Sequence, residues 1–146
     1  MNEPAQSWAG LLGGNDRRGG SSAARASRPQ ELVWRVSLPD AIRSSPVFHN
    51  GLLFVTCRDG RLYALALADG RQLWRSASLR QITAPPLAAP ASVLVQSFTG
   101  AAKAYDLDTG AELWTASLGG SLQSTPAVTD DYIFLATHPG VVYAVR

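Results

Sequence analysis

The sequence predicts an all-β fold, a partial β-propeller of about three four-stranded antiparallel blades, and three observations predict it. Landmark residues recur at one fixed interval from residue 32 to the carboxyl end. Each repeated unit contains short apolar runs separated by turn residues. The runs are apolar throughout rather than alternating, which indicates sheets covered on both faces. Helical repeats of similar period would not tolerate a proline and two turn sites in every unit.

The period is carried by tryptophan, proline, glycine and alanine, each of which recurs at intervals of 40 residues. The positions are Trp34, Trp74 and Trp114; Pro46, Pro86 and Pro126; Gly60, Gly100 and Gly140; and Ala64, Ala104 and Ala144. The chain contains only four tryptophans in 146 residues, so three at equal spacing are not a coincidence. Repeats of this length are typical of arrays in which neighbouring units bury a shared core.

Within residues 31–146 the strands follow in a regular order. An outer strand at 32–38 comes first. Blade 45–77 contains a strand at 45–48, an Asn-Gly hairpin turn at 50–51, an apolar run at 52–55, a turn at 59–60, a third strand at 62–67 and an outer strand at 72–76. Blade 85–117 repeats this order. The partial blade 125–146 supplies three strands and lacks its outer one.

Residues 1–30 form a Gly-, Ser- and Arg-rich leader that we expect to be mostly irregular, because it has few large apolar side chains. Trp8, Leu11 and Leu12 are the exceptions that could dock on the body. The leader holds four of the 13 cationic and two of the 11 acidic residues, which leaves nine of each for residues 31–146. A neutral body predicts no nucleic-acid binding, which needs a dense cationic stripe.

No apolar run is long enough to span a membrane, and the sequence as given has no export signal, so the default expectation is a cytoplasmic protein. The single cysteine, Cys57, ends an apolar run and is expected to be a buried, inert thiol. His49 and His138 stand beside turn residues, and we expect both to be exposed.

Residues 104–114, AYDLDTGAELW, resemble the tryptophan-docking motif of pyrroloquinoline quinone (PQQ)-type propeller repeats, A-x-D-x-x-T-G-x-x-x-W, at every fixed position. Residues 64–74 keep the Ala, Gly and Trp but have Ala66 and Asp69 in place of the Asp and Thr. Residues 8–19 are similar to the W-x-x-F-x-G-D-x-x-R-x-G segment that often precedes such repeats. The motif implies a slot in which an indole lies flat on a tight turn, between blades. The structural blade-docking residues are then Trp34, Trp74, Trp114, Ala64, Gly70, Ala104, Asp106, Thr109 and Gly110.

The same family has an enzyme branch, the quinone-dependent alcohol and sugar dehydrogenases. The resemblance implies for them a calcium ion, a catalytic Asp and often a disulfide of adjacent cysteines at the centre of the propeller. Calcium needs several converging oxygen ligands, whereas most carboxylates of this chain stand at repeat turns. We therefore expect no catalytic, cofactor-binding or metal-binding residues, with PQQ and calcium only under the alternative interpretation.

The number of blades raises a further question, because propellers typically have at least four. We expect the chain to be a fragment of a longer propeller. Alternatively, two copies associate head to tail, each donating residues 32–38 to the last blade of the other, and make a ring of six blades.

The function expected from these features is a non-catalytic propeller module for protein interaction or assembly, similar in kind to the outer-membrane assembly lipoprotein that shares such repeats. The resemblance implies a protein partner and, since the family is often periplasmic, a periplasmic location as the alternative to the cytoplasm. Two other functions stay open: a portion of a PQQ-dependent alcohol or sugar dehydrogenase whose catalytic residues lie outside this chain, and a regulatory sensor domain.

Overall fold

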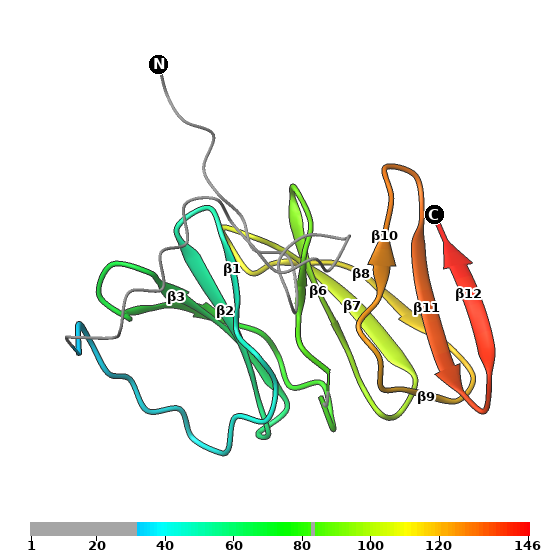
Figure 1. Ribbon diagram of the computed structural model, residues 1–146, viewed down its shortest axis with the longest axis horizontal. Coiled ribbons are helices and arrows are strands. Elements are labelled where there is room, and N and C mark those ends of the chain that lie inside the picture. The colour runs from blue at the N-terminus through cyan, green and yellow to red at the C-terminus, as the bar shows by residue number, and fades with distance from the viewer. Residues whose placement is uncertain (1–31, 83) are drawn as a thin grey trace.

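The computed structural model describes residues 32–82 and 84–146, and in these ranges it contains twelve strands and no helix. The predicted leader, with Trp8, Leu11 and Leu12, lies outside the described residues. The strands form three antiparallel sheets that follow one another along the chain (Figure 1). This arrangement confirms the predicted all-β fold and the open, partial propeller.

The first two sheets have the simple order of consecutive hairpins that a propeller blade requires. The first sheet contains β1 (Val47–His49), β2 (Leu52–Cys57), β3 (Arg61–Ala66) and β4 (Gln72–Arg75). The second contains β5 (Leu87–Ala88), β6 (Ser92–Gln96), β7 (Ala101–Asp106) and β8 (Glu112–Ser117). The third contains β10 (Ala127–Val128), β11 (Ile133–His138) and β12 (Val141–Val145), and β9 (Ser121–Leu122) pairs with one end of β11.

The turns form where the sequence places residues that tolerate a left-handed backbone. Asn50 and Gly51 join β1 to β2 with φ angles of 48° and 77°, as a tight hairpin turn requires. The third and fourth strands of the first two sheets pair in one register, with Ala64 opposite Trp74 and Ala104 opposite Trp114. In both sheets the register shifts directly after the alanine. The 40-residue period of the sequence is thus a period of backbone geometry.

The core lies between the sheets. The largest cluster joins Phe54 and Leu62 of the first sheet to Val93 and Tyr105 of the second. Two further clusters join the second sheet to the third. Strands β2 and β6 are buried on both faces over most of their length, whereas β11 alternates between buried and exposed residues. The third sheet therefore has one covered and one open face.

Two details differ from the expectations. Residues 32–38 were expected to form an outer strand, but they belong to no strand, and no described strand pairs with them. Strand β12, whose edge this segment was expected to complete, lies at the opposite end of the described structure (Figure 1). His49 was expected to be exposed, yet it is only 8% exposed. It is the last residue of β1, and the alternation of a strand places it on the same buried face as Val47. His138 ends β11 and is exposed, as expected.

Candidate functional site

Trp74 joins the first two sheets. Its indole N–H donates a hydrogen bond to the carbonyl oxygen of Leu107 at 2.9 Å, in the turn after β7. Its ring lies against Gly110, where a Cβ atom would come within 2.5 Å of the indole Cδ2. Phe54 and Tyr105 pack at its sides, with ring centroids 5.8 and 6.5 Å away. Only glycine at position 110 leaves this slot open.

Trp34 makes the same two contacts one unit earlier. Its indole N–H donates to the carbonyl oxygen of Leu67 at 2.8 Å, and a Cβ at Gly70 would lie 2.6 Å from its Cε3 atom. Trp114 packs beside Ile133 of the third sheet. Its indole N–H has no hydrogen-bond partner among the described residues.

The turn that holds Trp74 is shaped by Asp106 and Thr109. The Asp106 carboxylate accepts hydrogen bonds from the backbone N–H of Thr109 at 2.8 Å, from its hydroxyl at 2.7 Å and from the N–H of Asp108 at 3.1 Å. These bonds, first of all that from the Thr109 backbone, hold the pKa of Asp106 below its ordinary value. In the first unit, Asp69 accepts from the N–H of Arg71 at 2.9 Å, as Thr109 accepts from Ala111.

A pocket of about 610 Å³ opens between the first and second sheets, at the end of the strands opposite these turns. Segments far apart in the sequence build it: the chain before β1, the β2–β3 turn, the β4–β5 connection and the β6–β7 turn. Its lining includes Arg43, Arg58, Thr56, Gln81, Ile82 and Phe98. Phe98 is 47% exposed, although it is a large aromatic side chain.

Backbone contacts fix the wall that carries Phe98. Its N–H donates to the carbonyl oxygen of Gln81 at 2.9 Å, and Ile82 forms an isolated β-bridge with Ser97. Gln81 has a φ of 56°, an uncommon conformation for a residue other than glycine. The surrounding contacts hold it there, and backbone conformations of this kind cluster at functional sites. The pocket is therefore preformed rather than made by loose loops.

The pocket carries unpaired positive charge. Arg43 and Arg58 are both exposed, and neither has an ion-pair partner among the described residues. The nearby Asp59 is already engaged: it accepts the hydroxyl of Tyr63 at 2.5 Å and pairs with Arg61 at 4.0 Å. Burial, followed by this bond to Asp59, raises the pKa of Tyr63. The pocket can thus attract an anionic group beside an apolar surface.

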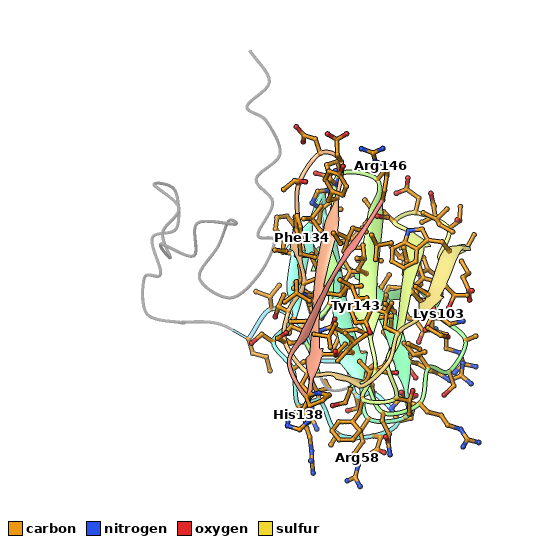
Figure 2. All side chains as sticks on the ribbon, turned by 90° about the vertical axis from the view of Figure 1, so that its right-hand side faces the viewer. Arg58, Lys103, Phe134, His138, Tyr143 and Arg146 are labelled. Atoms are coloured by element: carbon orange, nitrogen blue, oxygen red, sulfur yellow. The ribbon has the colours of Figure 1, made fainter. Side chains whose placement is uncertain are left out.

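Figure 2 shows Arg58 and His138 at one end of the strands and Arg146 at the other. The carboxylates of the opposite end belong to the turns after β3 and β7 and to the β10–β11 hairpin; they are Asp69, Asp106, Asp108, Asp130 and Asp131. The two unpaired arginines of the pocket therefore lie at the other end of the strands from these five carboxylates.

The remaining candidate groups are engaged or isolated. Cys57 is 1% exposed, as expected, and its thiol donates to the carbonyl oxygen of Asp40 at 3.2 Å. Within the described residues, no three His, Cys, Asp or Glu side chains stand close enough to hold a metal ion. The carboxylates there serve separate turns and do not converge on one point, as the oxygen ligands of a calcium ion would. No helix in the same ranges has the length and hydropathy to cross a membrane.

Sequence reasoning missed the pocket. One signal was present: Arg58, Phe98 and His138 occupy equivalent positions, 40 residues apart, just before the turn residues. Their side chains differ completely, while the glycine two residues later is constant. A repeat position that varies in this way is free of the common structural role and is available for function. The 40-residue period could not predict that Arg43 and Arg58 line the same pocket.

The family model for outer membrane protein assembly factor BamB matches residues 20–146. An outer membrane protein assembly factor BamB from Nitrosomonas eutropha is 28% identical over 126 residues, which cover 85% of this chain and 31% of that protein. The crystal structure of BamB from Moraxella catarrhalis has a TM-score of 0.68 at 27% identity, and the match covers 77% of this chain and 36% of that one.

A quinohemoprotein alcohol dehydrogenase, ADHIIG from Pseudomonas putida HK5, is similar in fold alone. Its TM-score is 0.77 at 18% identity, over 95% of this chain and 25% of the dehydrogenase. The chain thus spans about a third of the length of the assembly factors, 31% and 36%, and less of the dehydrogenase. The shared architecture is that of PQQ-like propeller repeats.

Proposed function

Because the chain belongs to the family of outer membrane protein assembly factor BamB, we propose that it is a non-catalytic propeller module that binds a protein partner during outer membrane protein assembly. This function places it where outer membrane proteins are assembled, in the periplasm rather than the cytoplasm. It requires no cofactor. The observation that carries the proposal is the preformed pocket with two unpaired arginines and an exposed phenylalanine between the first and second sheets.

The pocket favours a partner segment that combines carboxylates with an apolar side chain. Two guanidinium groups can each form a charge-assisted hydrogen bond with a carboxylate. Phe98 and Ile82 supply the apolar surface beside them. Arginine and aromatic residues in one concave place are the residue types that dominate protein interfaces. Electrostatic attraction would also speed the encounter at low salt.

Fluorescence anisotropy with two labelled peptides tests this proposal. One peptide alternates Asp and Leu, and the other has Asn in place of every Asp. We expect the acidic peptide to bind and the amide peptide to bind at least about tenfold more weakly, which corresponds to about 1.4 kcal/mol. Equal affinity of the two peptides, or no binding of either, would overturn the proposal.

Matched variants locate the binding. The double variant Arg43→Gln/Arg58→Gln removes both charges of the pocket, and Phe98→Ala removes its aromatic surface. Arg71→Gln is the control, because Arg71 is also an exposed arginine but lies near the opposite end of the strands. The pocket variants should lose affinity for the acidic peptide while the control keeps it. Equal losses in all three would show that the peptide responds to net charge alone.

The dehydrogenase alternative has the fold likeness in its favour, but within the described residues no donor set supports it. Titration with quinone and calcium, followed by absorbance and dye reduction, separates the two functions. We expect no saturable cofactor binding by this chain, and saturable binding would favour the dehydrogenase interpretation.

A further inference from the structure

Three turns of one geometry lie at the pocket end of the strands, between β2 and β3, β6 and β7, and β11 and β12. A backbone hydrogen bond closes each turn, from a glycine N–H to the carbonyl oxygen three positions earlier, at 3.0 Å for Gly60, 3.1 Å for Gly100 and 2.7 Å for Gly140. The residue directly after the acceptor is Arg58 in the first turn, Phe98 in the second and His138 in the third. These three residues, called the turn row below, therefore occupy the same place in three equivalent turns.

A second backbone contact fixes each member of the turn row. Arg58 and Phe98 donate their backbone N–H to the carbonyl oxygen of the residue 17 positions earlier, at 2.9 Å in both cases. His138 pairs with the residue at the same interval, Ser121, where β9 meets β11. The position of the turn row is thus set by backbone contacts that do not depend on its side chains.

The turn row is exposed even where neighbouring sheets pack together. The first sheet packs on the second and the second on the third, and yet the side chains of Arg58 and Phe98 remain exposed. Exposure therefore belongs to this position of the repeat, and His138 is exposed in the same way. Figure 2 shows Arg58 and His138 at the same end of the molecule. The described sheets together present the row on one surface.

The three side chains offer three kinds of contact. Arg58 can form charge-assisted hydrogen bonds with a carboxylate, and Phe98 offers an apolar ring. The imidazole of His138 can donate a hydrogen bond from a ring nitrogen, and it makes none with the described residues. The residues that line the hollow around it, among them Ser121 and Gln123, include no carboxylate. An acidic group of a partner would therefore meet no competing negative charge there.

The spacing of the turn row predicts which residues of a partner it can contact. Sheets that pack face to face lie about 10 Å apart, and buried clusters join the first sheet to the second and the second to the third. Neighbouring members of the row are therefore separated by about 10 Å. An extended chain advances about 3.3 Å per residue, so about three residues separate one contact from the next. A segment of about seven residues spans the whole row.

Resting on the proposed function, we propose that the partner segment lies extended across the pocket end of the three sheets and that the turn row contacts every third residue of it. A first carboxylate binds Arg58 together with Arg43 in the pocket. The residue three positions away packs an apolar side chain on Phe98, and the residue three further on accepts a hydrogen bond from His138 with a second carboxylate. Phe98 lines the pocket and belongs to the row, so the row continues the pocket.

Fluorescence anisotropy with three labelled peptides, amidated at the carboxyl end, tests the spacing. The first, Asp-Ser-Ser-Leu-Ser-Ser-Asp, has the predicted interval. The second, Asp-Leu-Ser-Ser-Ser-Ser-Asp, has the same composition with the leucine displaced, and the third is the half-length Asp-Ser-Ser-Leu. We expect the first to bind at least about threefold more tightly than either of the others, because only it reaches all three positions. Equal affinity of the first and second peptides would overturn the proposal.

Variants at His138 test the third contact. His138→Ala should weaken the seven-residue peptide to about the affinity of the half-length one, which should itself bind unchanged. His138→Arg should strengthen only the seven-residue peptide, because a permanent cation then faces its second carboxylate. Thr129→Ala is the matched control, since Thr129 is an exposed residue of the same sheet in the β10–β11 hairpin, at the opposite end of the strands. The control should alter neither affinity, and all variants should melt like the parent.

The outcomes separate this inference from the proposed function. If the alternating Asp-Leu peptide binds at the pocket but His138→Ala leaves the seven-residue peptide unaffected, the extension of the site to His138 is wrong and the proposed function stands. An equal loss for the seven-residue and half-length peptides would also overturn the extension, because His138 would then act on the pocket itself. If no acidic peptide binds, both proposals fail.

Discussion

Substitution of Gly110 by alanine tests the indole slot, with Gly51 as its internal reference. Both glycines have a left-handed backbone, with φ angles of 71° and 77°. They differ in their surroundings. A Cβ at Gly110 would lie 2.5 Å from the Cδ2 and 2.6 Å from the Cε3 of Trp74, whereas a Cβ at Gly51 would meet nothing within 4 Å. Comparing the two alanine variants therefore separates the cost of backbone strain from the cost of displacing the Trp74 ring.

The expected magnitudes follow from these contacts. Alanine in a left-handed conformation costs about 1–2 kcal/mol at either position. At position 110 the indole must also move, which loses its bond to Leu107, worth about 0.5–1.5 kcal/mol. The displaced ring also loses its packing on Phe54 and Tyr105, worth about 0.5–1.5 kcal/mol for each aromatic pair. Gly110→Ala should thus destabilise the fold by about 1.5–4.5 kcal/mol more than Gly51→Ala.

Urea denaturation measures this difference. The free energy of unfolding of each variant is taken from curves followed by circular dichroism at one fixed protein concentration, because association would otherwise shift the midpoints. Tryptophan fluorescence gives a second, independent curve for each variant. If the two substitutions destabilise the fold equally, the ring does not occupy the slot, and the reasoning on Trp74 is refuted.

Three further predictions concern single groups. The lowered pKa of Asp106 means that its carboxylate stabilises the fold at pH values above the pKa of an unfolded aspartate, about 3.9, and that this contribution is lost as the pH falls through the lower pKa of the folded state. Asp106→Asn should therefore lower the urea midpoint at neutral pH and have less effect once the pH falls below the folded pKa. An effect independent of pH would contradict this. The Lys103 ammonium lies 2.6 Å from the Glu112 carboxylate, and this bond raises the pKa of Lys103. Because the pair is partly exposed, Lys103→Met should lower the free energy of unfolding by at most about 1 kcal/mol, and by less in about 1 M salt. A larger loss of stability that salt does not change would contradict this. Cys57 is buried, so a maleimide should label it only when urea unfolds the chain, and rapid labelling of the folded protein would show that the thiol is accessible.

Much of the fold could be predicted because its determinants are local and periodic. The Asn50-Gly51 turn, the apolar runs on either side of it and the recurring tryptophans each specify a short stretch of backbone. Repetition at 40 residues then fixes how many sheets follow one another. The AYDLDTGAELW segment also anticipated the turn around Asp106 and Thr109, since the hydrogen bonds of that turn join residues only two or three positions apart.

The remaining features depend on contacts between distant segments. His49 is both next to a turn, where side chains are usually exposed, and the last residue of a strand, whose alternation places it on the buried face. The neighbouring residues in the sequence did not indicate which of the two positions would decide its burial. Arg43, Arg58 and Phe98 meet only because the turns of two sheets lie side by side, which no local pattern encodes. Residues 32–38 have the sequence of an outer strand, but a strand needs a partner edge, and the described chain does not bring one to it.

Hydrogen exchange of the indole N–H groups, followed by nuclear magnetic resonance, tests the central claim that tryptophans from one sheet dock on the turn of the next. The N–H groups of Trp34 and Trp74 are bonded to the carbonyl oxygens of Leu67 and Leu107, whereas that of Trp114 has no acceptor among the described residues. We predict slow exchange for Trp74 and Trp34 and fast exchange for Trp114. Exchange of Trp74 as fast as that of Trp114 would contradict the account.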